Sequence, residues 1–155
     1  MLIFLTIAFA LLYSSLIEYC LHRFALHHSP KQRHIVNHHQ KFHGSKTYQS
    51  KYITPKDVIS NKKYIFSNIL PSIPFSLILF TINQGLGLLF IITSISYTLW
   101  VEYVHYFFHK GGNSLLEHLK FFQTLKEHHR IHHCIYNTNY GIASRLWDKV
   151  FKTKK

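Results

Sequence analysis

Long apolar runs alternate with basic, histidine-rich segments along the 155 residues of the chain. Residues 1–17 carry no charge, and between residues 63 and 110 the only charged side chain is Glu102. A membrane-spanning helix needs about 20 mostly apolar residues, so the first run predicts one span and the second is long enough for two. An Asn-Gln-Gly turn at 83–85 would divide the second run. We therefore expect an all-α integral membrane protein with three transmembrane helices, at about residues 2–20, 65–82 and 86–108.

Size supports this membrane assignment. A soluble domain of 155 residues cannot bury two such apolar runs, because too little of its volume lies away from water. The first run lacks the positive leading segment and the small-residue cleavage site of a signal peptide, so we interpret it as a retained anchor. Pro71 and Pro74 fall inside the second span and should kink it or mark its start. Residues 1–155 are interpreted as one domain.

Charge predicts the orientation of the spans. All 18 Lys and Arg lie in residues 22–63 and 110–155, nine in each segment. The positive-inside rule places both segments in the cytoplasm, which puts the N-terminus outside and the C-terminus inside. The net charge of +12 then serves mainly orientation and contact with anionic lipid. No DNA- or RNA-binding motif is present, so no nucleic-acid partner is expected.

Histidine is the unusual residue, with 14 copies, none of them near the predicted outer side. Twelve lie in the two basic segments, in compact motifs of the forms H-x4-H, H-x3-HH and H-x2-HH, and a further H-x3-H motif lies at the inner end of the third span. Residues three and four apart share one face of a helix, so one helix can offer several imidazoles to one ion. We expect His105 and His109 to reach one ion together, and His129, His132 and His133 to do the same from a last helix that starts at a Ser114-x-x-Glu117 capping box.

Clustered imidazoles indicate metal. Ten or more of them buried without a cation would leave many donors and acceptors unpaired. Four histidines fill one site, so ten fit two metals, and neutral imidazole suits iron, zinc, copper or nickel. His118 and His28, which stand apart from these motifs, are interpreted as surface or interfacial residues.

Two glutamates lie one helical turn before a histidine motif. Glu18 precedes His22 by four residues, and Glu102 precedes His105 by three. A carboxylate in this position can accept the second ring N–H of a ligating histidine and so fix its orientation. Each glutamate could equally be a direct metal ligand or an interfacial residue, and we favour the hydrogen-bonding role.

The motifs occur in a fixed order: E-x3-H-x4-H at 18–27, H-x3-HH at 34–39, E-x2-H-x3-H at 102–109, H-x2-HH at 129–133 and a closing stretch at 139–153. In this the chain resembles the membrane-bound fatty acid hydroxylase and sterol desaturase superfamily, most closely the fatty acid 2-hydroxylase type. The middle hairpin matches by hydropathy alone. The second motif departs from the H-x2-HH that is usual there. Within it we favour His38 and His39 as ligands, then His34, then His43.

The resemblance implies a cytoplasmic dimetal site that activates O2 with two iron ions, which zinc can replace during purification. It implies ten ligands: His22, His27, His34, His38, His39, His105, His109, His129, His132 and His133. His43 and His128 are further candidates, and Asp148 is a candidate hydrogen-bond partner of a ligand, with Gly141 allowing a tight turn in the tail.

The implied reaction is hydroxylation of an unactivated C–H bond of a lipid, a fatty acyl chain or a sterol-like substrate. No electron-transfer domain is evident, so a separate cytochrome or ferredoxin with its reductase is expected to supply two electrons. Desaturation or carotenoid hydroxylation is the alternative within the superfamily. A histidine-rich metal transporter or metal store is the alternative of another class, although a transporter should hold its ligands near the bilayer midplane.

Aromatic residues gather at the inner end of the third span. They either line the path by which a lipid reaches the metals or form an ordinary interfacial belt. They are Trp100, Tyr103, Tyr106, Phe107 and Phe108. Trp147 is interpreted as a packing anchor.

Overall fold

The computed structural model describes residues 1–27, 34–59, 62–112 and 114–155. Every regular element in these ranges is a helix, and one isolated bridge joins Ser50 to Lys110. The all-α prediction is therefore confirmed for the part of the chain that is described. Within the described residues, three helices are long and apolar enough to cross a membrane: Leu2–His27, Lys62–Ile82 and Gln84–His109.

The first of these helices changes its hydrogen-bonding pattern near its end. It runs as the α-helix α1 (Leu2–Cys20) and continues directly as a π-helix, η1 (Leu21–His27). The predicted end at residue 20 therefore marks the change from α to π, not the end of the helix. Its continuation carries the first histidine motif beyond the apolar run.

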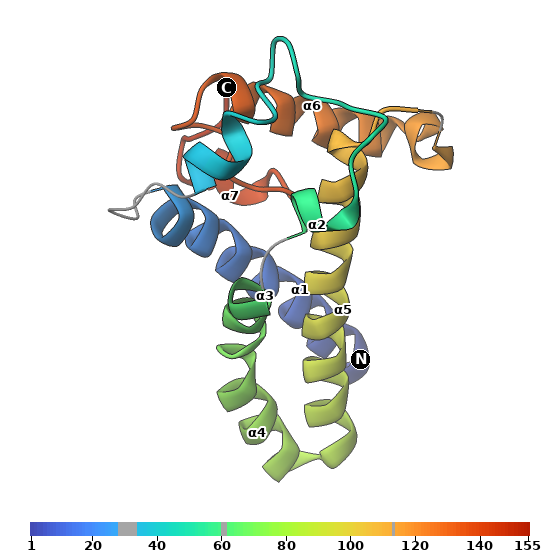
Figure 1. Ribbon diagram of the computed structural model, residues 1–155. Helices are drawn as coiled ribbons and strands as arrows, with labels where there is room; N and C mark the ends of the chain where they lie inside the picture. Colours follow the sequence, from blue (N-terminus) through green and yellow to red (C-terminus); the bar gives the residue numbers. More distant parts are fainter. Residues whose placement is uncertain (28–33, 60–61, 113) are drawn as a thin grey trace.

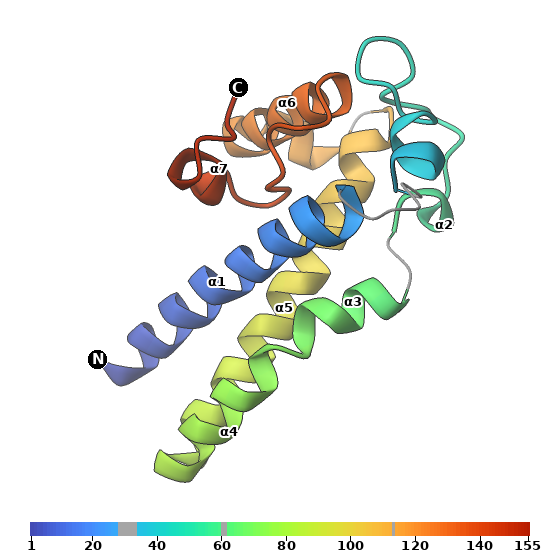
Figure 2. The same ribbon diagram turned by 90° about the vertical axis from the view of Figure 1, so that its left-hand side faces the viewer.

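The second helix is broken at Pro71, as the sequence predicts. It consists of α3 (Lys62–Ile69) and α4 (Ser72–Ile82), which are inclined to each other in Figure 2. Proline cannot donate a main-chain hydrogen bond, so the ladder of α3 cannot continue through it. Pro74 falls in the first turn of α4, where an N–H would have no partner within the helix.

Helix α4 and the third long helix, α5 (Gln84–His109), form an antiparallel hairpin with only Asn83 between them. The Asn83 side chain caps α5 by accepting the Leu86 N–H at 3.2 Å. Gly87 allows the two helices to approach closely, because a Cβ there would lie 2.7 Å from the Ser76 carbonyl oxygen. The Ser76 hydroxyl donates to the Gly87 carbonyl at 2.8 Å and closes the contact.

The remaining elements form a cap at one end of the long helices (Figures 1 and 2). They are η2 (Ile35–His39), α2 (Pro55–Val58), η3 (Leu115–His118), α6 (Lys120–Cys134) and α7 (Leu146–Val150). The N-terminus and the α4–α5 turn lie at the opposite end. A small apolar core joins the cap to α5, and in it Phe108 packs on Phe122 with ring centroids 5.1 Å apart.

The predicted single helix from Ser114 to His133 is wrong. Ser114 caps the 3-10 helix η3, and Leu119 is then extended, with φ −90° and ψ 116°, before α6 begins. The Glu117 carboxylate forms an ion pair with Lys126 in α6 instead of completing a capping box. The break makes η3 a separate turn beside the end of α5.

Candidate metal centre

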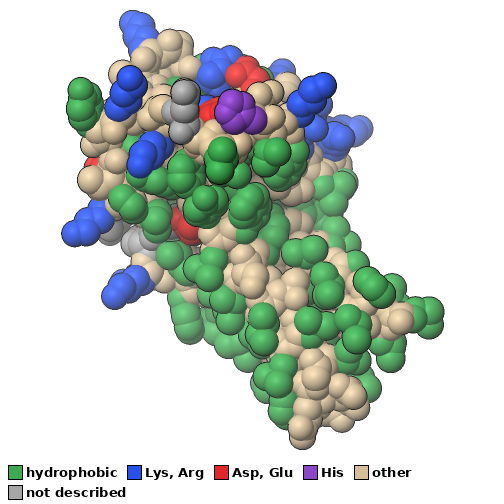
Figure 3. Space-filling model, turned by 90° about the vertical axis from the view of Figure 1, so that its right-hand side faces the viewer, with side chains coloured by type: hydrophobic (Ala, Val, Ile, Leu, Met, Phe, Trp, Pro, Cys, Tyr) green, Lys and Arg blue, Asp and Glu red, His purple; other side chains and the backbone are tan. Residues whose placement is uncertain are grey.

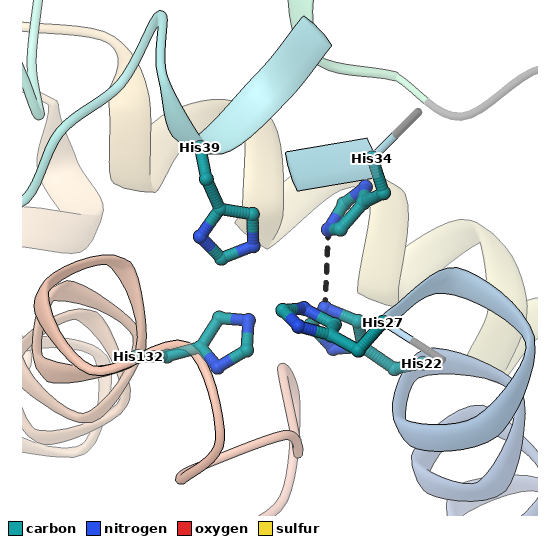
Figure 4. Close-up of side chains that lie close together, drawn as sticks. All are labelled: His22, His27, His34, His39 and His132. Carbon is teal, nitrogen blue, oxygen red and sulfur yellow. Dashed lines mark hydrogen bonds between the residues drawn. The ribbon is translucent and has the colours of Figure 1, made fainter. Parts of the chain in front are cut away.

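Among the described residues, ten histidines gather where the cap meets α5 and η1, in two groups of five. In each group the candidate ligand nitrogens all lie within 4.8 Å of one another. The first histidine group is His22, His27, His34, His39 and His132 (Figure 4). The second histidine group is His38, His105, His109, His129 and His133. These are the ten residues expected from the sequence, and that they bind metal stays a prediction.

The π-helices explain which histidines join which group. Backbone hydrogen bonds in a π-helix run between residues five apart, so such residues lie on one side. His22 and His27 in η1 have this spacing and share the first group. His34, at the start of η2, and His39 have the same spacing and join them, while His38 points into the second group. The unusual H-x3-HH motif thus supplies both groups.

The α-helical motifs follow α-helical spacing. His105 and His109 of α5 are four apart and both belong to the second group, as expected. On α6, His129 and His133 belong to the second group but His132 to the first, so the expectation that all three reach one ion is wrong. An α-helix turns about 100° per residue. His132 is therefore rotated from His129 by about 60° in one direction, and His133 by about 40° in the other. Helix α6 therefore contributes ligand candidates to both groups.

Main-chain carbonyl groups hold the outer nitrogens of four histidines. The Nδ1···O bonds join His22 to Tyr140, His132 to Thr138, His109 to Tyr48 and His133 to Phe42, at 2.5, 2.6, 2.9 and 2.6 Å. A carbonyl only accepts, so each Nδ1 carries the proton and each Nε2 presents a lone pair. These partners could not be predicted from the sequence, because every residue carries a main-chain carbonyl group.

The unprotonated nitrogens converge. In the second group, Nε2 of His129 lies 3.2 Å from Nε2 of His109 and 3.1 Å from Nε2 of His133. His129 can donate to one of these at most, which leaves lone pairs facing each other. In the first group, both ring nitrogens of His39 and Nε2 of His132 are buried without a hydrogen-bond partner among the described residues. Buried nitrogens of this kind are costly unless a cation binds them, so both groups fit a metal ion.

The cap keeps its histidines neutral. Burial lowers the pKa of His34, His38, His129 and His132, and the neighbouring imidazoles lower it further. Burial is also the main reason that the pKa of His39 is lowered to about 2. Neutral imidazole is the form that ligates a metal, so these side chains are ready to bind near neutral pH.

Comparison with known proteins shows the family of the chain. The sequence model of the fatty acid hydroxylase family matches residues 7–153. The chain belongs to the fatty acid hydroxylase family. A rat (Rattus norvegicus) protein named fatty acid 2-hydroxylase is 30% identical over 152 residues, which cover 90% of this chain and 36% of that protein. The chain therefore spans about a third of the curated relative's length. No solved structure matches the chain.

In this fatty acid hydroxylase family member, the expected hydrogen bond between Glu18 and His22 is replaced by other partners on both sides. The two ring nitrogens of His22 face the Tyr140 carbonyl and Nε2 of His34. The tail that follows α6 crosses the end of α1, and Glu18 instead accepts the Ile142 N–H at 3.0 Å. Glu18 therefore fixes the tail to α1.

The second glutamate, Glu102, is buried on α5 one turn before His105. The predicted hydrogen bond between this carboxylate and the His105 ring stays a prediction.

Asp148 organises the tail from within. Its carboxylate is fully buried and accepts the N–H groups of Tyr140 and Gly141, both at 2.8 Å, the Thr153 hydroxyl at 2.7 Å and Nε2 of His128 at 3.0 Å. Burial alone would raise the pKa of Asp148, but the hydrogen bonds, led by that from His128, lower it overall. Asp148 thus holds Tyr140, whose carbonyl fixes His22.

Several further candidates lie outside both groups. His128 pairs with Asp148, and Nδ1 of His43 lies 2.9 Å from the Ser45 hydroxyl, so neither belongs with the ten. His118 is exposed, as expected, whereas His28 lies outside the described residues. Trp147 anchors α7 by donating from Nε1 to the Ser15 hydroxyl at 2.9 Å.

Gly141 forms the tight turn that the sequence predicts. A Cβ at this position would lie 1.9 Å from the Ser144 carbonyl oxygen, so only glycine fits. The turn returns the tail toward Asp148.

Tyr103 and Phe107 of α5 do not line a path to the histidines. Tyr103 and Phe107 lie about 160° around the helix from His105, on its opposite side. Trp100 and Tyr103 are exposed, and Phe108 is buried in the apolar core. This arrangement favours the interfacial belt.

Proposed function

We propose that the protein is a membrane-bound non-haem diiron oxygenase that hydroxylates a fatty acyl chain. The observation that carries this proposal is the convergence of unprotonated, buried ring nitrogens in two adjacent groups. The groups touch, since the rings of His39 and His133 stack with centroids 4.1 Å apart. The family and the rat relative point to a fatty acid as substrate and to carbon 2 as the position oxidised.

In this reaction the chain holds the metal ions, orients their histidine ligands and shields the site. Two iron ions, when bound, supply the activation of O2 and the cleavage of the C–H bond, which no protein side chain can perform. The ten histidines hold the ions, and the carbonyl groups of Phe42, Tyr48, Thr138 and Tyr140 fix the rings. A separate cytochrome or ferredoxin with its reductase supplies the two electrons.

A groove between α1 and α5 offers a place for the acyl chain. It has a volume of about 430 Å³ and its walls include Leu11, Leu12, Ser15, Tyr97, Trp100 and Ser144. The Tyr97 hydroxyl donates to Glu18 at 3.4 Å, and Glu18 lies one helical turn before His22. The groove therefore runs along the apolar helices toward the first histidine group, as an acyl chain bound in a bilayer would.

The cap is proposed to face the cytoplasm. All 18 Lys and Arg lie in residues 22–63 and 110–155, which build the cap and include the adjoining ends of the first two candidate spans. The positive-inside rule assigns such segments to the cytoplasmic side.

Metal transport is the weaker hypothesis. The long-helix histidines lie at helix ends, with His27 and His109 as the last residues of two candidate spans. A transporter would hold its ions near the bilayer midplane.

Lipid analysis of expressing cells tests the proposal. A host without fatty acid hydroxylase activity would express the parent chain, His39→Ala, or His118→Ala as a matched control outside both groups, under heavy-isotope O2. Hydroxylated acyl chains carrying heavy oxygen are expected from the parent and His118→Ala, and none from His39→Ala. Chains that have lost two hydrogens and gained no oxygen would show desaturation instead. Unchanged lipids in cells that retain more metal would favour a metal store.

A further inference from the structure

A pocket on the outer side of α5 lies away from both histidine groups. Its volume is about 500 Å³, and it lies where the helix leaves its candidate membrane span. Tyr103 and Phe107 form one wall, Leu115 and Leu116 of η3 form another, and Lys110 and Ser114 are also part of the lining. The pocket is therefore apolar with a cationic group among its walls.

The segment beside this pocket exposes large apolar side chains. Leu115 is 89% exposed, Phe121 54% and Leu119 50%. Figure 3 shows hydrophobic side chains on this face extending from the long helices to a border of Lys and Arg. Isolated exposed apolar residues are common, but a contiguous patch with a polar border marks an interaction surface.

We propose that this pocket binds an anionic phospholipid of the adjacent leaflet, with η3 and the start of α6 inserted in the membrane interface. The acyl chains would lie along Tyr103 and Phe107, and the phosphate would meet the Lys110 ammonium. Two observations select this occupant: the patch is continuous with a helix that is able to span the bilayer, and the charge of Lys110 complements a phosphate. The site is separate from the reaction, because Tyr103 and Phe107 lie opposite His105 on the helix.

Added tryptophans test the membrane contact. Leu115→Trp and Phe121→Trp are compared with Lys46→Trp, an exposed position in the loop at the far side of the cap, in the full chain in lipid nanodiscs. The emission of Trp100 and Trp147 in the parent is subtracted. Brominated phospholipids should quench the first two added tryptophans strongly and the third weakly. Quenching at Leu115 and Phe121 no greater than at Lys46 would overturn the proposal.

Lipid selectivity tests the anionic site itself. Spin-labelled phosphatidylglycerol and phosphatidylcholine report the parent's preference for the anionic lipid. Lys110→Gln should reduce that preference about five-fold, the effect of one lysine at a membrane surface. Lys110→Arg keeps the charge and should keep the preference, as should Lys46→Gln. An unchanged preference in Lys110→Gln would show that the pocket does not select an anionic lipid.

Discussion

Replacing Asp148 by asparagine tests whether the tail fixes the first histidine group. The substitution keeps the shape of the side chain but exchanges one accepting oxygen for an NH2 group that donates. The two oxygens of Asp148 accept the main-chain N–H groups of Tyr140 and Gly141, one on each. Whichever way the amide turns, one of these buried N–H groups faces a donor and loses its partner.

The expected magnitude follows from that loss. A buried donor left unsatisfied costs about 1–3 kcal/mol, so Asp148→Asn should lower the free energy of unfolding by about that amount. Tyr140 is the residue whose carbonyl orients His22. Disturbing an outer partner of a metal ligand lowers metal affinity or activity by about 10–100-fold. Metal should therefore be lost at concentrations that saturate the parent.

The assay combines thermal unfolding with elemental analysis of metal per chain in purified protein. Glu127→Gln is the matched control, since Glu127 lies on the surface of α6 and pairs with Arg130. An exposed pair of this kind contributes at most about 1 kcal/mol. If Asp148→Asn retained the parent's metal content and unfolding temperature, the tail would have no role in orienting His22.

Four further results are expected. Burial lowers the pKa of His39 to about 2 from 6.5, so below pH 6.5 the unfolded chain binds more protons than the folded chain. The metal-free protein should therefore lose stability by about 1.4 kcal/mol for each pH unit below 6.5 from this residue alone. Denaturant titrations at several pH values measure this slope. Glu102→Gln should lower metal content or product yield about 10–100-fold if the carboxylate orients His105, and unchanged values would make it merely interfacial. Leu12→Trp should fill the groove between α1 and α5 and reduce the yield of long-chain products while metal content stays constant; an unaffected yield would place the acyl chain elsewhere. Tags at the N- and C-termini should report opposite sides of the membrane, and tags on one side would exclude three spans.

Hydropathy and spacing predicted the long helices and the ten clustered histidines, because both depend on residue type at a fixed interval. Pro71 broke its helix as expected, since a missing N–H acts locally. The division of His34, His38 and His39 could not be predicted from α-helical spacing. It depends on two π-helical segments, which place His34 with His39 and send His38 to the other group.

The hydrogen-bond partners of the histidine rings could not be predicted either, for a different reason. Glu18 has the spacing of a partner for His22, yet a carbonyl from a segment over a hundred residues away takes that place. A main-chain carbonyl is present at every residue, so only the folded path of the tail selects Tyr140. Asp148 was a candidate for contact with a ligand, and the structure shows that it acts through the main chain of Tyr140 instead.

Shared helices couple the two histidine groups. Both η2 and α6 give side chains to each group, so one ion cannot order its own ligands without ordering part of the other set. With two ions, as proposed, the first to bind would bear most of the entropic cost of fixing these helices, and the second would bind to a framework that is already rigid. Loading should therefore be cooperative, with few singly occupied molecules at intermediate metal concentration. Substitution of a ligand in either group should then release metal from both groups. A preparation of the protein should contain fully loaded and metal-free molecules.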